Sequence, residues 1–253
     1  MKKNILCFAI ICLLPLQSVF SQAKQEDKVV LTPAQTLDPN SVASSREVNP
    51  KMIKLGLKFA PNLSFIIPST QDYSYNGVKI GGVLGLVSDF YFAEHYAFST
   101  GFNVLLLGGK LTYPDSVTGK VRGKTNSSLS FFYFEIPVMV KMFTKQFGRF
   151  SFFGQIGFGT GFRISASAKT EFTGNTGYTQ SEKTSITYQT TTIRESLLIG
   201  LGTEFHLDQS TRLFFGLGYS NSLNNVLTGH NAVSGMNQKA YLNYAELNLG
   251  VMF

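Results

Sequence analysis

Three histidines are the side chains of this chain best suited to acid–base chemistry, and they are far apart in the sequence. His95 and His206 stand in short polar connections, whereas His230 lies in a longer segment rich in Ser, Asn and Gly. His230 with Ser222 or Ser234 could supply the base and the nucleophile of an acyltransferase or a protease. Such residues are common in polar loops, however. The sequence therefore predicts a protein that is not an enzyme.

The sequence also gives little sign of a site for a metal ion, a phosphate group or a nucleic acid. The histidines are scattered, and both cysteines, Cys7 and Cys12, lie in a segment expected to be removed. The glycine runs GFGTGF at 157–162 and GLGTEF at 200–205 lack the lysine and the following helix of a phosphate-binding loop. The excess of 22 Lys and Arg over 15 Asp and Glu is scattered along the chain. We expect no cofactor, no metal and no nucleic-acid partner.

Charged residues also recur inside apolar runs, and their spacing indicates the element that positions them. In FFYFEIPVMVKMF, residues 131–143, every second residue is apolar, while the alternate positions include Glu135 and Lys141. This two-residue period predicts a β-strand with one wholly apolar face and one face that carries charge. The charged positions of this kind are Lys58, Lys79, Asp89, Glu135, Lys141, Arg163, Arg194, Glu204 and Glu246.

The same alternation recurs about eight times from residue 52 to the end. The expected strands cover 53–65, 78–92, 96–111, 131–143, 150–165, 197–205, 213–219 and 240–253. Short connections at 93–95, 144–149 and 206–211 alternate with long ones near 67–77, 112–128, 167–191 and 221–238. Outer-membrane barrels have short periplasmic turns, long extracellular loops and an even number of strands. We therefore expect an all-β fold, an eight-stranded antiparallel up-and-down transmembrane β-barrel over 52–253, with both termini periplasmic.

The composition supports an apolar outer surface. Charged residues make up 15% of the chain, against roughly 25% in a soluble domain, and Gly (24) and Phe (23) are abundant. After the first residues no stretch of about 20 apolar residues could form a membrane helix. A closed barrel is the other way to place such a surface in lipid. Aromatic side chains near the expected turns would form an interfacial girdle, namely Phe92, Tyr96, Phe98, Phe150 and Phe205.

The N-terminal region has two expected parts. Lys2 and Lys3 precede an apolar run over 5–16, and a small-residue site follows, so residues 1–21 have the form of a secretory signal peptide. Residues 22–51 are polar and interrupted by prolines, which predicts a flexible periplasmic segment.

The narrow interior of an eight-stranded barrel constrains the charged positions. Such a barrel is just wide enough for its side chains, and an isolated buried charge is costly. We therefore expect the nine charged residues to form a structural, charge-balanced network in the lumen, with a conducting pore as the alternative. Pro137 cannot donate a hydrogen bond to the ladder, and periodicity gives no reason for its place in a strand.

Two segments carry a family resemblance. YFEIPVMVK at 133–141, the following FGQIGFGTGF at 153–162 and the phenylalanine at 253 resemble the PorT-like outer-membrane β-barrel family of Bacteroidetes-type bacteria. The resemblance extends from about residue 52 to the end. It implies a small non-enzymatic barrel, and the namesake members of the family assist the type IX secretion system. It also implies that Pro137 is a family feature and that Phe253 is the terminal aromatic engaged by the barrel-assembly machinery.

The leading functional hypothesis is a non-enzymatic outer-membrane protein that assists type IX-like protein secretion through contacts of its N-terminal segment, turns or loops. The expected partners are outer-membrane lipid, the barrel-assembly machinery and components of a secretion system. One alternative is a small porin or a ligand-binding barrel. Another is a barrel enzyme that acts on lipid at its outer rim and depends on His230.

Overall fold

The computed structural model describes residues 53–117, 121–175, 177–208, 210–229 and 237–253. The expected signal peptide (1–21) and N-terminal segment (22–51) lie outside these residues. The strands are β1 (Ile53–Pro68), β2 (Ser74–Tyr75), β3 (Lys79–Ala93), β4 (Tyr96–Val117), β5 (Val121–Phe143), β6 (Phe150–Gly174), β7 (Thr179–Ser185), β8 (Ile193–His206), β9 (Arg212–Ser222) and β10 (Ala240–Met252), and a short 3-10 helix, η1, covers Thr187–Gln189. Within the described part of the chain, no helix has the length and apolarity needed to cross a membrane.

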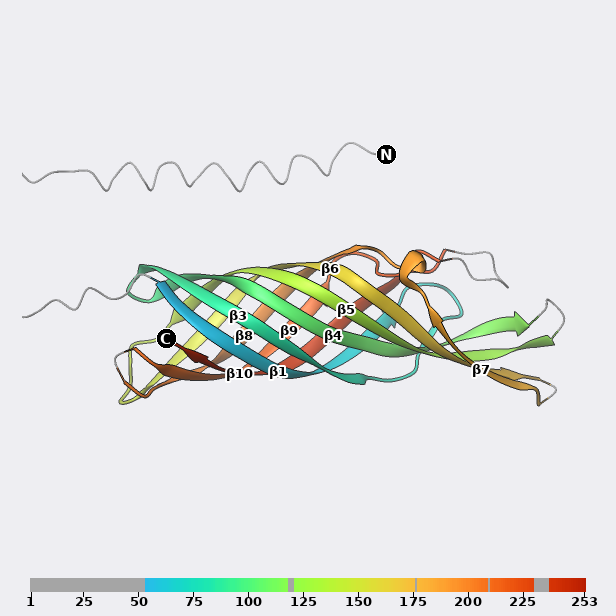
Figure 1. Cartoon of the computed structure of the whole chain (residues 1–253), viewed down its shortest axis with the longest axis horizontal. Helices are drawn as coiled ribbons and strands as arrows, with labels where there is room; N and C mark the ends of the chain where they lie inside the picture. Colours follow the sequence, from blue (N-terminus) through green and yellow to red (C-terminus); the bar gives the residue numbers. More distant parts are fainter. Residues whose placement is uncertain (1–52, 118–120, 176, 209, 230–236) are drawn as a thin grey trace, which may run out of the picture. The chain divides into compact units, whose positions relative to one another are not determined.

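Eight strands close into a ring (Figure 1). Each pairs antiparallel with two neighbours in the order β1, β3, β4, β5, β6, β8, β9, β10, and β10 returns to β1. The closing ladder runs from Gly56 opposite Met252 to Pro68 opposite Ala240. A closed ring leaves no edge strand, so backbone groups are paired within the sheet. The predicted eight-stranded antiparallel fold is confirmed.

The two ends of the barrel differ. Residues 94–95, 144–149 and 207–211 form tight connections at one end, the short-turn end, where β1 begins and β10 ends. The strands β1, β4, β6 and β9 end at the other, the long-loop end, which also holds the described connecting residues 69–78, 175, 177–192, 223–229 and 237–239. Asp208 shapes one short turn, because its Oδ1 accepts hydrogen bonds from the backbone N–H groups of Ser210 and Thr211, each 2.7 Å long. These bonds favour the ionised carboxylate and lower the pKa of Asp208.

Two of the expected long loops are largely β-structure, which corrects the prediction. The segment 112–128 belongs mostly to β4 and β5, and 167–191 contains the end of β6 and all of β7. These strands project beyond the rest of the barrel in Figure 1. We call residues 110–117, 121–130, 166–174 and 179–185 the sheet extension. Its outward face is polar, so the apolar alternation that marks the barrel strands is lost there, although Thr and Val still favour extended backbone.

The side chains that face outward from the barrel strands are apolar and exposed. Leu84 is 62% exposed and Leu201 is 63% exposed, whereas their inward neighbours Val83 and Gly200 are buried. At the short-turn end, aromatic rings meet across strands. They pair as Phe92 with Tyr96, whose centroids are 6.1 Å apart, and as Phe150 with Phe205, at 5.0 Å.

Pro137 occupies an interruption in the ladder between β4 and β5. Thr100 pairs with Val138 and Asn103 pairs with Glu135, but the two residues between them on each strand are unpaired. The missing N–H of Pro137 therefore falls where the ladder is open. The Thr100 hydroxyl donates a 2.7 Å hydrogen bond to the Pro137 carbonyl, which holds the two strands together across the gap.

Gly101 lies opposite Pro137 in this interruption, and on its other side it pairs with β3. Its φ is +157°, and a Cβ at this position would lie 1.9 Å from the carbonyl oxygen of Leu86 on β3. Only glycine lets the backbones of β3 and β4 approach so closely.

We predict that Gly101→Ala lowers the free energy of unfolding by about 1–3 kcal/mol, the usual cost of a strained backbone position. Gly154 is the matched control, because a Cβ there would meet nothing within 4 Å. Urea unfolding of the protein folded in lipid vesicles would measure both variants. Equal stability of Gly101→Ala and Gly154→Ala would contradict the role assigned to Gly101.

Candidate functional site

The lumen near the short-turn end holds a buried network of two carboxylates and two cations. Lys141 Nζ lies 3.0 Å from Asp89 Oδ2 and 2.8 Å from Glu204 Oε1. Arg212 Nη1 lies 3.0 Å from Glu204 Oε2. The Ser99 hydroxyl donates a 2.5 Å hydrogen bond to Asp89 Oδ1. Both carboxylates are therefore paired with protein cations, which offsets the cost of burying them.

Aromatic rings complete the surroundings of Lys141. Its Nζ lies 4.3 Å from the ring centroid of Phe153, 4.9 Å from that of Phe143 and 5.8 Å from that of Phe214. Phe153 and Phe214 pack with Met252 in one buried apolar cluster. Cation–π attraction adds to the ion pairs, and the rings fill the width of the lumen at this level.

A second charged group lies in the middle of the lumen. Arg194 and Glu135 are both fully buried, and Arg194 Nη1 is 3.3 Å from Glu135 Oε2. The remaining donors of Arg194 are used as well, because Nη2 donates to the Ser220 hydroxyl at 2.7 Å and to the Leu242 carbonyl at 3.0 Å. Asn103 Nδ2 donates to the other oxygen of Glu135 at 3.4 Å. These bonds join β4, β5, β8, β9 and β10 across the interior.

Lys58 and Glu246 form the third pair. Their Nζ and Oε1 atoms are 2.7 Å apart, and both side chains are largely buried. The pair joins β1 to β10, the two strands whose pairing closes the ring. The structure thus places seven of the nine charged residues singled out from the sequence in ion pairs.

Lys79 and Arg163 form no ion pair in the described part of the chain, which corrects the expectation that all nine charges would balance one another. The Arg163 guanidinium binds the loop that precedes β8 instead, donating to the carbonyls of Thr187 and Thr190, the latter at 3.0 Å. Lys79 donates to the hydroxyl of Ser130 and, at 3.4 Å, to the carbonyl of Leu129. Both cations hold together the long-loop end.

Arg212 was not among the predicted lumen residues. It lies at the first position of β9, one residue before the expected strand began. Phe214, two residues later, faces inward and is 6% exposed. Side chains two residues apart in a strand point to the same face, so Arg212 faces inward as Phe214 does. Extending the expected strand by one residue toward the N-terminus would have included it.

An apolar plug fills the lumen toward the long-loop end. Its buried members include Leu105, Leu107 and Leu111 on β4, with Phe131 and Tyr133 on β5. The connection between β9 and β10 also enters this cluster through Val226 and Leu227, which are 0% and 4% exposed. The backbone N–H of Val226 donates to the carbonyl of Ala240 at 2.9 Å, which fixes the inserted segment to the barrel wall.

Little space remains among these layers. Within the described residues, a cavity of about 40 Å³ lies between Lys58, Asn103, Lys141 and Asn248. The Oδ1 atom of Asn248 is buried there without a hydrogen-bond partner from the protein. The cavity has room for water and a polar group to hold it, but it is no passage for a solute.

The histidines do not assemble a catalytic centre in the described part of the chain. His206 Nε2 and the Ser151 hydroxyl are 3.0 Å apart, and they share a pocket of about 210 Å³ at the short-turn end with His95. No carboxylate forms an ion pair with His206 among the described residues. His230 and Ser234 lie outside those residues, while Ser222 is buried and donates to the Asn224 carbonyl at 3.0 Å. The described residues also contain no cluster of three or more His, Cys, Asp or Glu suited to a metal ion.

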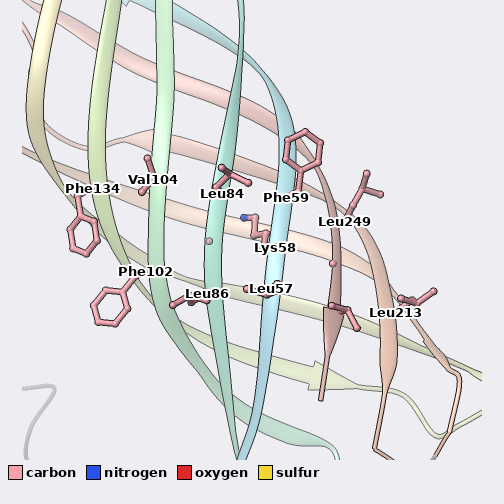
Figure 2. Close-up of a pocket in the computed structure, with 13 residues that line it drawn as sticks. Leu57, Lys58, Phe59, Leu84, Leu86, Phe102, Val104, Phe134, Leu213 and Leu249 are labelled. Atoms are coloured by element: carbon pink, nitrogen blue, oxygen red, sulfur yellow. The ribbon is translucent and has the colours of Figure 1, made fainter.

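The outer wall carries a groove of about 850 Å³ lined by residues of β9, β10, β1, β3, β4 and β5 (Figure 2). Outward apolar side chains line it, among them Leu57, Phe59 and Leu84. The charged residue at this groove is Lys58, whose ammonium is engaged by Glu246 in the lumen. The groove therefore offers no charged group to orient a ligand and continues the apolar outer surface.

We predict that Arg194→Met destabilises the barrel by about 3–5 kcal/mol, because it leaves Glu135 buried without its cation. The double variant Glu135→Gln, Arg194→Met should regain part of this loss. Lys169 provides the control, since its pair with Glu171 is exposed and its removal should cost about 0–1 kcal/mol. Urea unfolding measures all three. An Arg194→Met barrel as stable as Lys169→Gln would contradict the assigned pairing.

The chain is similar to several solved structures and to one family model. Solved structures similar to the chain include Neisserial surface protein A (11% identity, TM-score 0.43, covering 79% of this chain and 95% of that one) and Ail, the attachment invasion locus protein of Yersinia pestis (13%, 0.37, 79% and 97%). The outer membrane protein OprG of Pseudomonas aeruginosa is another (12%, 0.41, 79% and 94%). No curated protein matches the chain.

The outer membrane protein beta-barrel domain family matches residues 25–228, which is more than half of the chain. The chain therefore belongs to the outer membrane protein beta-barrel domain family.

Proposed function

We propose that this protein is a non-catalytic outer-membrane barrel that passes no solute and works by contacts with other proteins. The filled lumen carries the proposal. The Lys141 network with its phenylalanine rings, the Arg194–Glu135 pair and the apolar plug occupy successive levels of the interior. Transport would require all three levels to open, and opening the charged ones would separate buried ion pairs.

We also propose that the short-turn end faces the periplasm and the long-loop end faces outward. Short turns at one end and long connections at the other support this orientation, since outer-membrane barrels place them in this way. The sheet extension would then stand outside the cell. Contacts could be made there or on the periplasmic side, through the turns and the segment 22–51.

The finer proposal is a role as an accessory of type IX-like protein secretion. It rests on the resemblance of YFEIPVMVK at 133–141 to PorT-like barrels. A sealed barrel that acts through surface contacts is compatible with such a role. Recognition by the barrel-assembly machinery through Phe253 remains part of the proposal. The side chain of Phe253 is half exposed, and its N–H donates to the Leu55 carbonyl at 2.7 Å.

We predict that the purified protein forms no discrete channels in planar bilayers at modest voltage, because buried side chains of the described residues fill the lumen at three levels. A general porin reconstituted in the same membranes is the positive control. Reproducible single-channel steps from the purified protein would overturn the sealed-lumen proposal and favour the small-porin alternative.

The secretion role predicts that cells without the gene retain many normally secreted proteins in the periplasm. Quantitative proteomics of periplasm and medium would measure this in deletion and parent strains. A gene that encodes Gly154→Ala should restore secretion to the deletion strain, because the added Cβ would meet no other atom within 4 Å. An unchanged secretome would reject the secretion role and leave the sealed outer-membrane barrel intact.

A further inference from the structure

A row of lysines crosses the sheet extension. Lys110 on β4 pairs with Ser128 on β5, Ser128 pairs with Lys169 on β6, and Lys169 pairs with Lys183 on β7. Residues directly opposite one another in a sheet point to the same face. The three lysines and Ser128 therefore form one row, which we call the lysine row.

The lysine row lies on the outward face, on the long-loop side of the apolar band and separated from it by the row Gly108, Ser130 and Ser167. The neighbours of the row on the other face, Leu111, Leu129 and Ala168, are buried in the lumen. Four residues nearer the short-turn end than Lys110, the outward face of β4 becomes apolar with Leu106, which is 55% exposed. Five residues nearer that end than Lys169, the outward face of β6 becomes apolar with Ile164, which is 56% exposed. A charged headgroup would meet the barrel at the edge of such an apolar band.

Among the described residues, one of the three lysines of the row has a carboxylate partner, so most of the charge of the row is not balanced by ion pairs. Lys169 and Lys183 are directly opposite, an arrangement that is unfavourable for like charges. Lys169 has one exposed partner, Glu171 at 3.1 Å, but no carboxylate forms an ion pair with Lys110 or Lys183 in the described part of the chain. Lys110 and Lys183 also repel Lys79, whose ammonium lies at Ser130 nearby. An anion bound at the row would relieve this repulsion.

A pocket accompanies the lysine row. It has a volume of about 350 Å³ and is lined by Asn76, Lys110, Asn126, Ser127, Ser128, Lys169 and Glu171. Asn126 Oδ1 already accepts hydrogen bonds from Asn76 Nδ2 at 3.2 Å and from the Thr112 hydroxyl at 2.6 Å. Its amide nitrogen is thereby left as a donor, beside the ammonium groups of Lys110 and Lys169. This donor set suits phosphate oxygens.

The length of the lysine row indicates the kind of phosphate ligand. Neighbouring strands are about 4.8 Å apart, so the backbones at Lys110 and Lys169 are roughly 10 Å apart and those at Lys110 and Lys183 roughly 14 Å apart. One phosphate in the pocket can meet both Lys110 and Lys169, because each lysine side chain is long enough to cover half of the distance between their backbones. Lys183, at the far end of the row, is not part of the pocket lining, so a second phosphate on the same headgroup would meet it there. We propose that the lysine row and its pocket bind a membrane lipid whose headgroup carries two phosphate groups, in the leaflet at the long-loop end.

Native mass spectrometry of the full protein in detergent, with bisphosphorylated lipid A as the probe, would test the proposal. Monophosphorylated lipid A with the same acyl chains serves as the comparison. Each lysine near a lipid surface contributes about a fivefold gain in binding. We expect the bisphosphorylated probe to bind at least about fivefold more tightly than the monophosphorylated one, and the double variant Lys110→Gln, Lys169→Gln to lose at least about tenfold in affinity for it.

Two further variants sharpen the test. Lys145→Gln, Arg149→Gln removes the same charge from exposed residues at the short-turn end and should bind as the parent does. Glu171→Gln removes the carboxylate that competes for Lys169 and should bind more tightly. Equal losses for the two double variants, or no preference for the second phosphate, would overturn the proposal. Displacement of the probe by inorganic phosphate at equal concentration would show a free-anion site and would overturn the lipid assignment.

Discussion

The structure depends on one constraint: a backbone that crosses an apolar phase must satisfy its hydrogen bonds internally. Pairing of β1 with β10 meets this constraint by removing the two edges that an open sheet would leave. Local irregularities follow the same rule. Pro137, which has no N–H, lies where the β4–β5 ladder is already open, and the Thr100 hydroxyl replaces the missing contact.

Closure creates an interior that must be filled, and its small diameter determines how. Side chains from opposite walls meet there, so Lys141 reaches carboxylates from both β3 and β8, and Arg194 reaches groups from three other strands. Because these contacts join distant parts of the ring, the filled lumen stabilises the barrel and blocks it. The proposed function therefore depends on the surfaces, which are the sheet extension, the lysine row and the turns.

Much of this was predictable from residue alternation. Apolar positions at every second residue indicated the barrel strands, and Glu135 and Lys141 in the alternate column indicated a lumen with buried charge. Alternation could not identify pairing partners, because those depend on which strands face one another across the closed ring. It therefore failed for Arg163, which binds a loop, and for Lys79. It also failed over 112–128 and 167–191, where the outward residues of a strand meet water instead of an apolar phase and carry no apolar signal.

The central claim is that the lumen is sealed by its own side chains, and thiol accessibility tests it most directly. Ser196 lies in the lumen wall on β8 and is fully buried, whereas Ser181 on β7 is exposed. Each would be replaced by cysteine in a protein whose Cys7 and Cys12 are changed to serine, folded in lipid vesicles and treated with a small water-soluble thiol reagent. A sealed lumen predicts rapid labelling at Ser181→Cys and almost none at Ser196→Cys until the barrel is unfolded. Similar labelling rates at the two positions would show that water and small solutes enter the lumen, and would contradict the account.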